Sequence, residues 1–146
     1  MKSRTLGFLG LSALAVVALS AWGPHACGKP DAARKARFVT AMVDDTLDDL
    51  DATDEQRAAV HGLKDRLLAE GFALRDDNKA ARTQFLTQWQ SAQPNTTELH
   101  TLVDSRMTAV TAFAHKLADA ALELHTILTP AQRAELGERM AKHDRH

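Results

Sequence analysis

The feature that most limits the fold is the length of an uninterrupted helix-forming run. From Thr53 to about Ala92 no proline occurs, and apolar residues recur at helical spacing. They are Val60, Leu63, Leu67, Leu74, Ala81, Phe85 and Trp89. At about 1.5 Å per residue, a helix over this run would reach ~60 Å, far longer than a compact domain needs. The run therefore predicts one long helix, or two joined at Gly71, packed lengthwise on a partner.

The partner helix is predicted directly after the turn Gln93-Pro94-Asn95. Proline cannot continue the helix, and Asn95 with Glu98 offers a new helix start. Beyond the turn, apolar residues step by alternating threes and fours, which is typical of antiparallel helices packed lengthwise. They are Leu99, Val103, Met107, Val110, Ala114, Leu117, Ala121, Leu124 and Leu128. The sequence thus predicts a long antiparallel helical hairpin.

Two shorter helices are predicted to flank the hairpin. The first covers residues 30–50, and its apolar residues include Phe38, Val43 and Leu47. The second runs from Pro130 to about Lys142. Tyrosine is absent, Gly and Pro are few, and no segment predicts a sheet. The expected fold class is all-α, in one domain over residues 31–146 that follows a linker at 23–30.

Acidic residues gather at the end of the first predicted helix, where they oppose the helix dipole. They are Asp44, Asp45, Asp48 and Asp49. One interpretation is an acidic patch that meets cationic partners or a metal ion. The other is a solvated face, with Asp51, Asp54 and Glu55 helping the next helix to begin.

Two short segments resemble each other and both predict helix starts. Thr53-Asp54-Glu55-Gln56-Arg57 matches Thr129-Pro130-Ala131-Gln132-Arg133. In each, the threonine hydroxyl can accept a hydrogen bond from the backbone N–H three residues on, and the glutamine can reach back to the threonine N–H. Pro130 falls at the first helical position, where its missing N–H costs nothing. We interpret the two segments as an internal repeat.

The second segment, with Leu128, Thr129 and Gln132, carries a Leu-Thr-x-x-Gln signature. A small all-helical chain that has an export signal and carries this motif twice resembles the Spy/CpxP family of periplasmic stress chaperones and their heavy-metal-sensing relatives. The first copy has Ala52 where the family has leucine, so only Thr53 and Gln56 carry over. The resemblance covers roughly residues 31–146.

The N-terminal segment predicts export. Lys2 and Arg4 precede an uncharged run rich in Leu, Ala and Val from Thr5 to Trp22, which is typical of a secretory signal peptide. Cleavage is expected after residue 22, or as late as 26, and the run is marginal for the ~20 residues of a retained membrane anchor. Cys27, the single cysteine, would be the site of a lipoprotein anchor. We expect a periplasmic protein with no membrane span in the mature chain.

Some apolar side chains lie off the predicted seam. Phe72, Leu86 and Phe113 are among them, and two thin helices cannot cover both sides of their apolar surface in a monomer. Contiguous apolar surface of several hundred Å² usually marks an interaction site. The sequence therefore predicts a homodimer, a groove for apolar segments of unfolded proteins formed partly by these three residues, or both. The alternative is that they only cover the flanking helices.

Histidines are the most informative polar residues. His61, His100 and His115 each have an aspartate four residues later, on the same helical face. Two ligands do not make a structural zinc site, and hydrogen-bonded surface pairs are the simpler explanation. His143 and His146 resemble the histidine-bearing tails of zinc-binding family members, so zinc, nickel or copper is a candidate ligand there.

Composition and motifs narrow the function classes. Without Lys2 and Arg4, 16 basic and 19 acidic side chains remain, a net charge of about −3 that gives no footprint for nucleic acid. No nucleophile with a neighbouring base and no Gly-rich phosphate loop is present, so an enzyme is not expected and no cofactor is required. The resemblance implies an ATP-independent chaperone for unfolded or misfolded envelope proteins. The alternative it implies is a periplasmic heavy-metal sensor or binding protein, and a sensor kinase is a further candidate partner.

Overall fold

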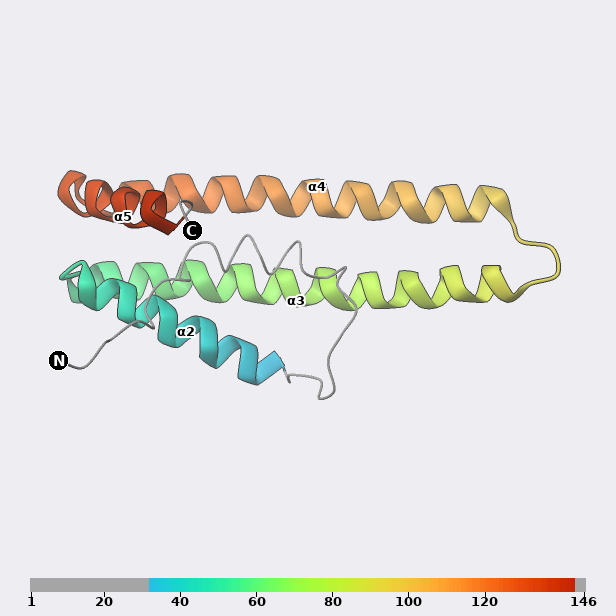
Figure 1. The fold of residues 1–146 in the computed structure, drawn as a ribbon, viewed down its shortest axis with the longest axis horizontal. Coiled ribbons are helices and arrows are strands. Elements are labelled where there is room, and N and C mark those ends of the chain that lie inside the picture. Colours follow the sequence, from blue (N-terminus) through green and yellow to red (C-terminus); the bar gives the residue numbers. More distant parts are fainter. Residues whose placement is uncertain (1–31, 144–146) are drawn as a thin grey trace.

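The computed structural model describes residues 32–143, and this part of the chain is all-α (Figure 1). Its helices are α2 (Ala32–Asp49), α3 (Asp54–Gln90), α4 (Thr96–Ile127) and α5 (Pro130–His143). The predicted fold class, a long antiparallel hairpin flanked by two shorter helices, is confirmed. The helix α3 is continuous through Gly71, so the single long helix is the correct alternative. The predicted signal segment, the linker at 23–30 and Cys27 lie outside the described residues.

The turn between α3 and α4 forms where proline and asparagine predicted it. The Asn95 side chain accepts a hydrogen bond from the Glu98 N–H at 3.2 Å and caps α4. Gln88, in the last turn of α3, completes the connection. Its Oε1 accepts from the Asn95 N–H at 2.8 Å, and its Nε2 donates to Glu98 Oε2 at 2.6 Å. Side chains of three residues therefore close the distal end of the hairpin.

The seam between α3 and α4 differs from the prediction in the middle of α4. The predicted residues Val103, Met107 and Val110 are exposed, with 60 % of Met107 open to solvent. The inner positions are instead Leu102, Arg106, Ala109 and Phe113.

Phe113 explains the difference. Only 7 % of it is exposed, and its ring lies against Gly71, where Cζ is 3.4 Å from the position a Cβ would occupy. Because glycine leaves room for an aromatic ring, α4 turns Phe113 rather than its neighbours toward α3. The expected place of Phe113 off the seam is therefore wrong.

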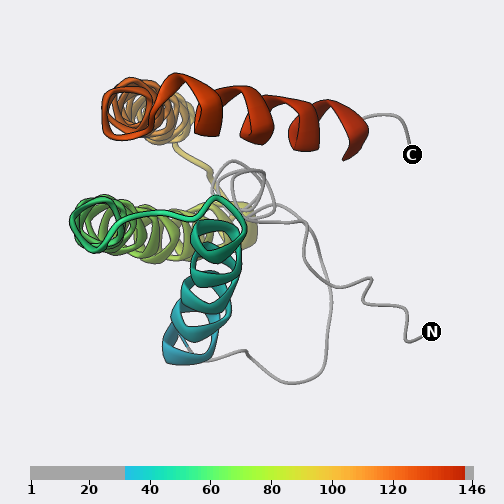
Figure 2. The ribbon, with the colours of Figure 1, turned by 90° about the vertical axis from the view of Figure 1, so that its left-hand side faces the viewer.

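The core lies at the end of the hairpin where α2 and α5 join it. Seen along the hairpin, α5 extends sideways from the end of α4 and α2 extends downward from beside α3 (Figure 2). One buried cluster joins α2 to α3 and contains Val39, Val43, Leu47, Ala52, Val60 and Leu68. A second joins α3 to α4 and contains Leu63, Leu67 and Ala120. From Pro130 to Lys142 no residue of α5 is buried, and its contacts with the rest of the chain include hydrogen bonds from Gln132 and Arg133 and the ion pair of Arg139 with Asp49.

A ladder of polar contacts fastens α2 along α3. Arg57 pairs with Asp48 at 2.7 Å, and His61 with Asp44 at 2.9 Å. Lys64 Nζ donates to Thr40 Oγ1 at 2.9 Å. The α3 partners advance by four and three residues while the α2 partners go back by four, as expected of antiparallel helices.

The acidic end of α2 is thereby explained. Asp44 and Asp48 bind α3, and Asp49 Oδ2 accepts from Arg139 of α5 at 2.5 Å. Arg139 also pairs with Glu135, and the carboxylates of Glu135 and Asp49 raise the pKa of its guanidinium. Neither a free acidic patch nor a merely solvated face describes these aspartates, because three of them hold neighbouring helices in place.

Candidate functional site

The two repeated segments form matching helix caps. Thr53 Oγ1 accepts from the Gln56 N–H at 3.3 Å, and Gln56 Oε1 accepts from the Thr53 N–H at 3.0 Å. In the second copy, Thr129 Oγ1 accepts from the Gln132 N–H at 3.3 Å, and Gln132 Oε1 accepts from the Thr129 N–H at 2.9 Å. Both predicted capping boxes are confirmed, and each satisfies two N–H groups that a helix start leaves unpaired.

The two caps also bind each other through their glutamines. Gln56 Nε2 donates to Gln132 Oε1 at 2.9 Å, and Gln132 Nε2 donates to Gln56 Oε1 at 3.1 Å. Gln56 Nε2 also donates to the Ile127 carbonyl at 2.9 Å, and Gln132 Nε2 to the Leu50 carbonyl at 3.0 Å. Each amide oxygen thus accepts twice and each amide nitrogen donates twice. This arrangement, called here the glutamine clamp, ties the ends of α2 and α4 to the starts of α3 and α5.

The arginine after each glutamine repeats as well. Arg57 Nε donates to the Ala52 carbonyl at 3.1 Å, and Arg133 donates to the Leu128 carbonyl at 2.7 Å. These carbonyls occupy equivalent positions in the two copies. Ala52, where the first copy departs from the leucine of the motif, is buried in the core, and Leu50 nearby is buried as well.

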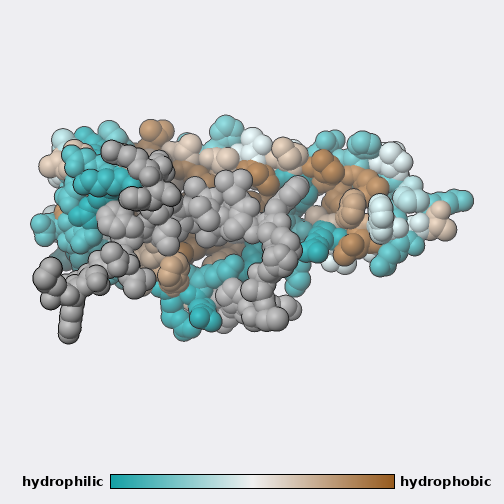
Figure 3. Space-filling model, in the orientation of Figure 1, coloured by the Kyte–Doolittle hydropathy of each residue, from teal (hydrophilic) through white to brown (hydrophobic). Residues whose placement is uncertain are grey.

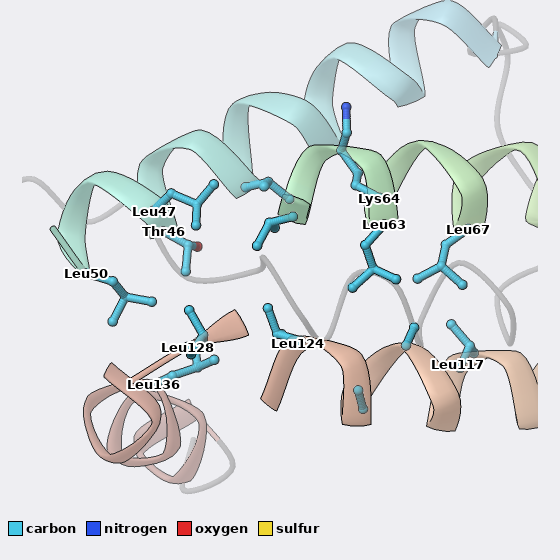
Figure 4. A pocket seen from close by; sticks show the side chains of 14 residues that line it. Thr46, Leu47, Leu50, Leu63, Lys64, Leu67, Leu117, Leu124, Leu128 and Leu136 are labelled. Atoms are coloured by element: carbon cyan, nitrogen blue, oxygen red, sulfur yellow. The ribbon is translucent and has the colours of Figure 1, made fainter. Parts of the chain in front are cut away.

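An apolar cleft lies beside the clamp, where the four helices converge (Figure 4). Its volume is about 210 Å³, and it is partly open to solvent. Leucines point into it from all four helices and from the residues that follow α2 and α4 (Figure 4). The lining residues are Val43, Thr46, Leu47, Leu50, Val60, Leu63, Lys64, Leu67, Leu117, Ala120, Ala121, Leu124, Leu128 and Leu136. The clamp supports this cleft directly, because Leu50 and Leu128 flank the two caps.

The cleft presents no charge to an occupant. Its only charged lining residue is Lys64, whose ammonium group lies against Thr40 and pairs with Asp65 Oδ1 at 2.8 Å. In Figure 4 this group points away from the space between the leucines. The cleft therefore suits an apolar side chain or short apolar segment.

Exposed apolar residues extend the cleft along α4. Residues seven apart lie on nearly the same face of a helix, because seven residues make about two turns. Val110 and Val103 are therefore in line with Leu117 of the cleft. Met107, fourteen residues before Ala121, is in line with that cleft residue. Figure 3 shows hydrophobic surface on the distal half of the hairpin over both α3 and α4. Val103, Met107 and Val110, the α4 stripe, were predicted as buried seam residues but form an exposed continuation of the cleft.

The three residues proposed from sequence for client binding have different environments. Leu86 is 45 % exposed near the end of α3. Phe72 is half-buried against the core cluster beneath α2. Phe113 is buried between α3 and α4. The structure brings none of them into the cleft, whose leucines were assigned from sequence to helix packing alone.

No three candidate metal ligands converge among residues 32–143. His61 lies against Asp44 of another helix, and Asp65, its predicted partner four residues later, pairs with Lys64. His146 lies outside the described residues, and His143 is described only as the last residue of α5. The metal site at His143 and His146 therefore stays a prediction.

Comparison with known proteins gives one match. A family described as LTXXQ motif family protein matches residues 40–140. The matched segment begins within α2 and ends within α5, so it includes both caps, the glutamine clamp and all residues of the cleft. No curated protein and no solved structure was found to match the chain.

Proposed function

The chain belongs to the LTXXQ motif family, the Spy/CpxP-type family, and from this premise we propose that it is a periplasmic ATP-independent chaperone. Its clients would be unfolded or misfolded envelope proteins. The observation that carries the proposal is the uncharged apolar cleft, continued by the exposed α4 stripe. Together they offer a long apolar surface that an extended polypeptide could contact at several points.

The size of the cleft favours weak, repeated contacts. A volume of about 210 Å³ holds one or two apolar side chains. Fully burying one such side chain stabilises a complex by roughly 1.5–3 kcal/mol, and part of that is offset by ordering the client. Each contact therefore breaks readily, and release needs no nucleotide because it does not have to be driven.

A charge placed in the cleft tests the proposal. Ala121 lines the cleft from an exposed position, so Ala121→Glu adds a carboxylate there without disturbing a buried residue. We expect the wild-type protein to suppress aggregation of a reduced or denatured client, and Ala121→Glu to need several-fold more protein for the same effect. Ala112→Glu is the matched control, since Ala112 is exposed on the opposite face of α4. Equal protection by both variants would exclude the cleft as the binding surface.

The metal-sensor alternative depends on His143 and His146. Calorimetric titration with Zn²⁺, Ni²⁺ and Cu²⁺ tests it in the tag-free protein. Heat that disappears in the double variant His143→Ala, His146→Ala would support a tail site, and heat that persists there would exclude it.

Homodimer formation is also a proposal, supported by the exposed apolar side chains of the α4 stripe. Sedimentation velocity of the wild type and of Met107→Glu tests it. A dimer that dissociates in the variant is expected, and a wild-type monomer at high concentration would refute the idea.

A further inference from the structure

One stripe of side chains runs along α3 from its start to its distal end. Within each half, successive members are three or four residues apart, and the two halves are seven residues apart, so all of them share one helical face. In the proximal half the members are Arg57, His61, Lys64 and Leu68. In the distal half they are Arg75, Lys79, Arg82, Leu86 and Trp89, called here the distal face.

The proximal half of the stripe is covered by the C-terminal half of α2, which carries four aspartates. Asp48, Asp44 and Thr40 of α2 meet Arg57, His61 and Lys64 in turn. Two of these three partners are carboxylates and the third is a hydroxyl, so this half of the stripe is complemented mainly by negatively charged groups.

In the distal half, the equivalent positions carry three cations with no acidic partner on another described helix. Arg75, Lys79 and Arg82 are exposed, and none forms an ion pair with another described residue. Asp76 is about 100° around the helix from Arg75. Asp77 lies toward α4, where its carboxylate is 3.9 Å from Arg106. The three positive charges are therefore available to an external partner.

The end of the same face is aromatic and uncharged. Trp89 is 75 % exposed, and its ring stacks with that of Phe85 at a centroid distance of 6.5 Å. Leu86 is exposed beside them. From residue 83 to residue 97 no side chain is charged, although a quarter of the whole chain is. Threonine, serine, glutamine and asparagine supply most of the polarity at this end of the hairpin.

We propose that the distal face docks on an anionic membrane surface. Exposed lysine and arginine side chains are attracted to anionic headgroups, and tryptophan and phenylalanine favour the headgroup level of a bilayer. The hairpin would lie on the surface rather than cross it. No helix in the described part of the chain is long and apolar enough for a membrane span.

One combination of side chains favours a lipid surface over a protein partner. At the far end of the hairpin from the apolar cleft, three exposed cations lie on one helix face with an exposed tryptophan, and this combination suits anionic headgroups and the headgroup level of a bilayer. A second copy could offer exposed carboxylates such as Asp104 and Asp119, so self-association is the competing outcome of the test. The inference does not depend on the proposed chaperone function, which uses the cleft.

Vesicle binding tests the inference with the predicted mature form, residues 23–146, in which Trp89 is the single tryptophan. All described contacts lie within this form. Vesicles of equal parts phosphatidylglycerol and phosphatidylcholine should shift the Trp89 emission to shorter wavelength and sediment with the protein. Pure phosphatidylcholine vesicles should bind at least tenfold more weakly. Binding should weaken strongly between about 50 and 500 mM NaCl, since salt screens exposed charges.

Matched variants locate the binding surface. Neutralising Arg75, Lys79 and Arg82 to glutamine should reduce partition by about fivefold per charge. Neutralising Arg34, Lys35 and Arg37 of α2 removes the same charge elsewhere and should have little effect. In co-sedimentation, Trp89→Ala should lower partition about tenfold, and the matched aromatic variant Phe38→Ala should not.

Three results would overturn the inference. Wild-type protein that does not sediment with anionic vesicles at low salt would exclude membrane docking. Equal losses in the distal and α2 charge variants would show that the distal face is not the binding surface. A change in oligomeric state with Trp89→Ala, without vesicle binding by the wild type, would assign the face to self-association. Because the vesicle assays do not measure protection of a client from aggregation, absent vesicle binding would leave the proposed function of the cleft unaffected.

Discussion

Replacing Gln132 by glutamate removes one side of the glutamine clamp and keeps most of its shape. The carboxylate still accepts from the Thr129 N–H, so the cap of α5 is retained. It can no longer donate to the Leu50 carbonyl or to Gln56 Oε1, which now face an acceptor. The substitution therefore removes hydrogen bonds between the two caps while the cap of α5 stays in place.

The structure sets the size of the expected effect. Two partly buried hydrogen bonds are lost, each worth about 0.5–1.5 kcal/mol, and two acceptors face a carboxylate. We expect Gln132→Glu to lower the free energy of unfolding by about 2–3 kcal/mol. Thr129→Ala, which removes a cap hydroxyl but leaves the clamp, should cost about 1 kcal/mol.

Urea unfolding followed by circular dichroism measures both values, and a double-mutant cycle isolates the pair. Gln56→Ala and Gln132→Ala should be non-additive by at least 0.5 kcal/mol or so, because the side chains are in direct contact. If the two substitutions were additive within about 0.3 kcal/mol, the direct contact between the two amides would contribute nothing to stability. If Gln132→Glu cost no more than Thr129→Ala, a stabilising connection between the caps would be refuted.

Three further predictions concern single positions. Asp51 has φ of 48°, the left-handed region that favours glycine, so Asp51→Gly should keep or raise stability and Asp51→Val should lower it by about 1 kcal/mol in urea unfolding. Hydrogen bonds from its own backbone and from the cap hydroxyl lower the pKa of Glu55. Its ionised form therefore stabilises the fold at neutral pH, and this advantage over Glu55→Gln should disappear as pH falls below the ordinary value of 4.5; a constant difference in unfolding midpoint from pH 7 to pH 3 would contradict this. Gly62→Ala meets no atom within 4 Å and should raise stability by about 0.5–1 kcal/mol, whereas Gly71→Ala should gain less because its Cβ meets the Phe113 ring; equal gains would contradict the packing.

Local sequence signals determined the helices and their ends. The boxes at Thr53 and Thr129, and Pro94-Asn95 at the turn, act over three or four residues. The interactions they predict form within one helix turn, whatever the rest of the chain does. For this reason the caps, the turn and the all-α class were predicted correctly.

Periodicity alone could not assign the apolar face of α4 to the right neighbour. A straight helix drifts by about 20° per heptad against a strict seven-residue repeat, so two adjacent stripes compete for the seam. Phe113 against Gly71 decided the competition, and Val103, Met107 and Val110 were left exposed. That contact joins two helices and has no signature in either segment.

The clamp and the acidic end of α2 likewise depended on the tertiary structure. Gln56 and Gln132 are 76 residues apart, and each looked complete as a local capping box. Only the convergence of the helix ends showed that their amides bind each other. Where the helices begin and end could be predicted from the sequence, because hydrogen bonds between near neighbours govern those positions. Which side chains meet, and which surface stays open, was decided by packing between distant segments.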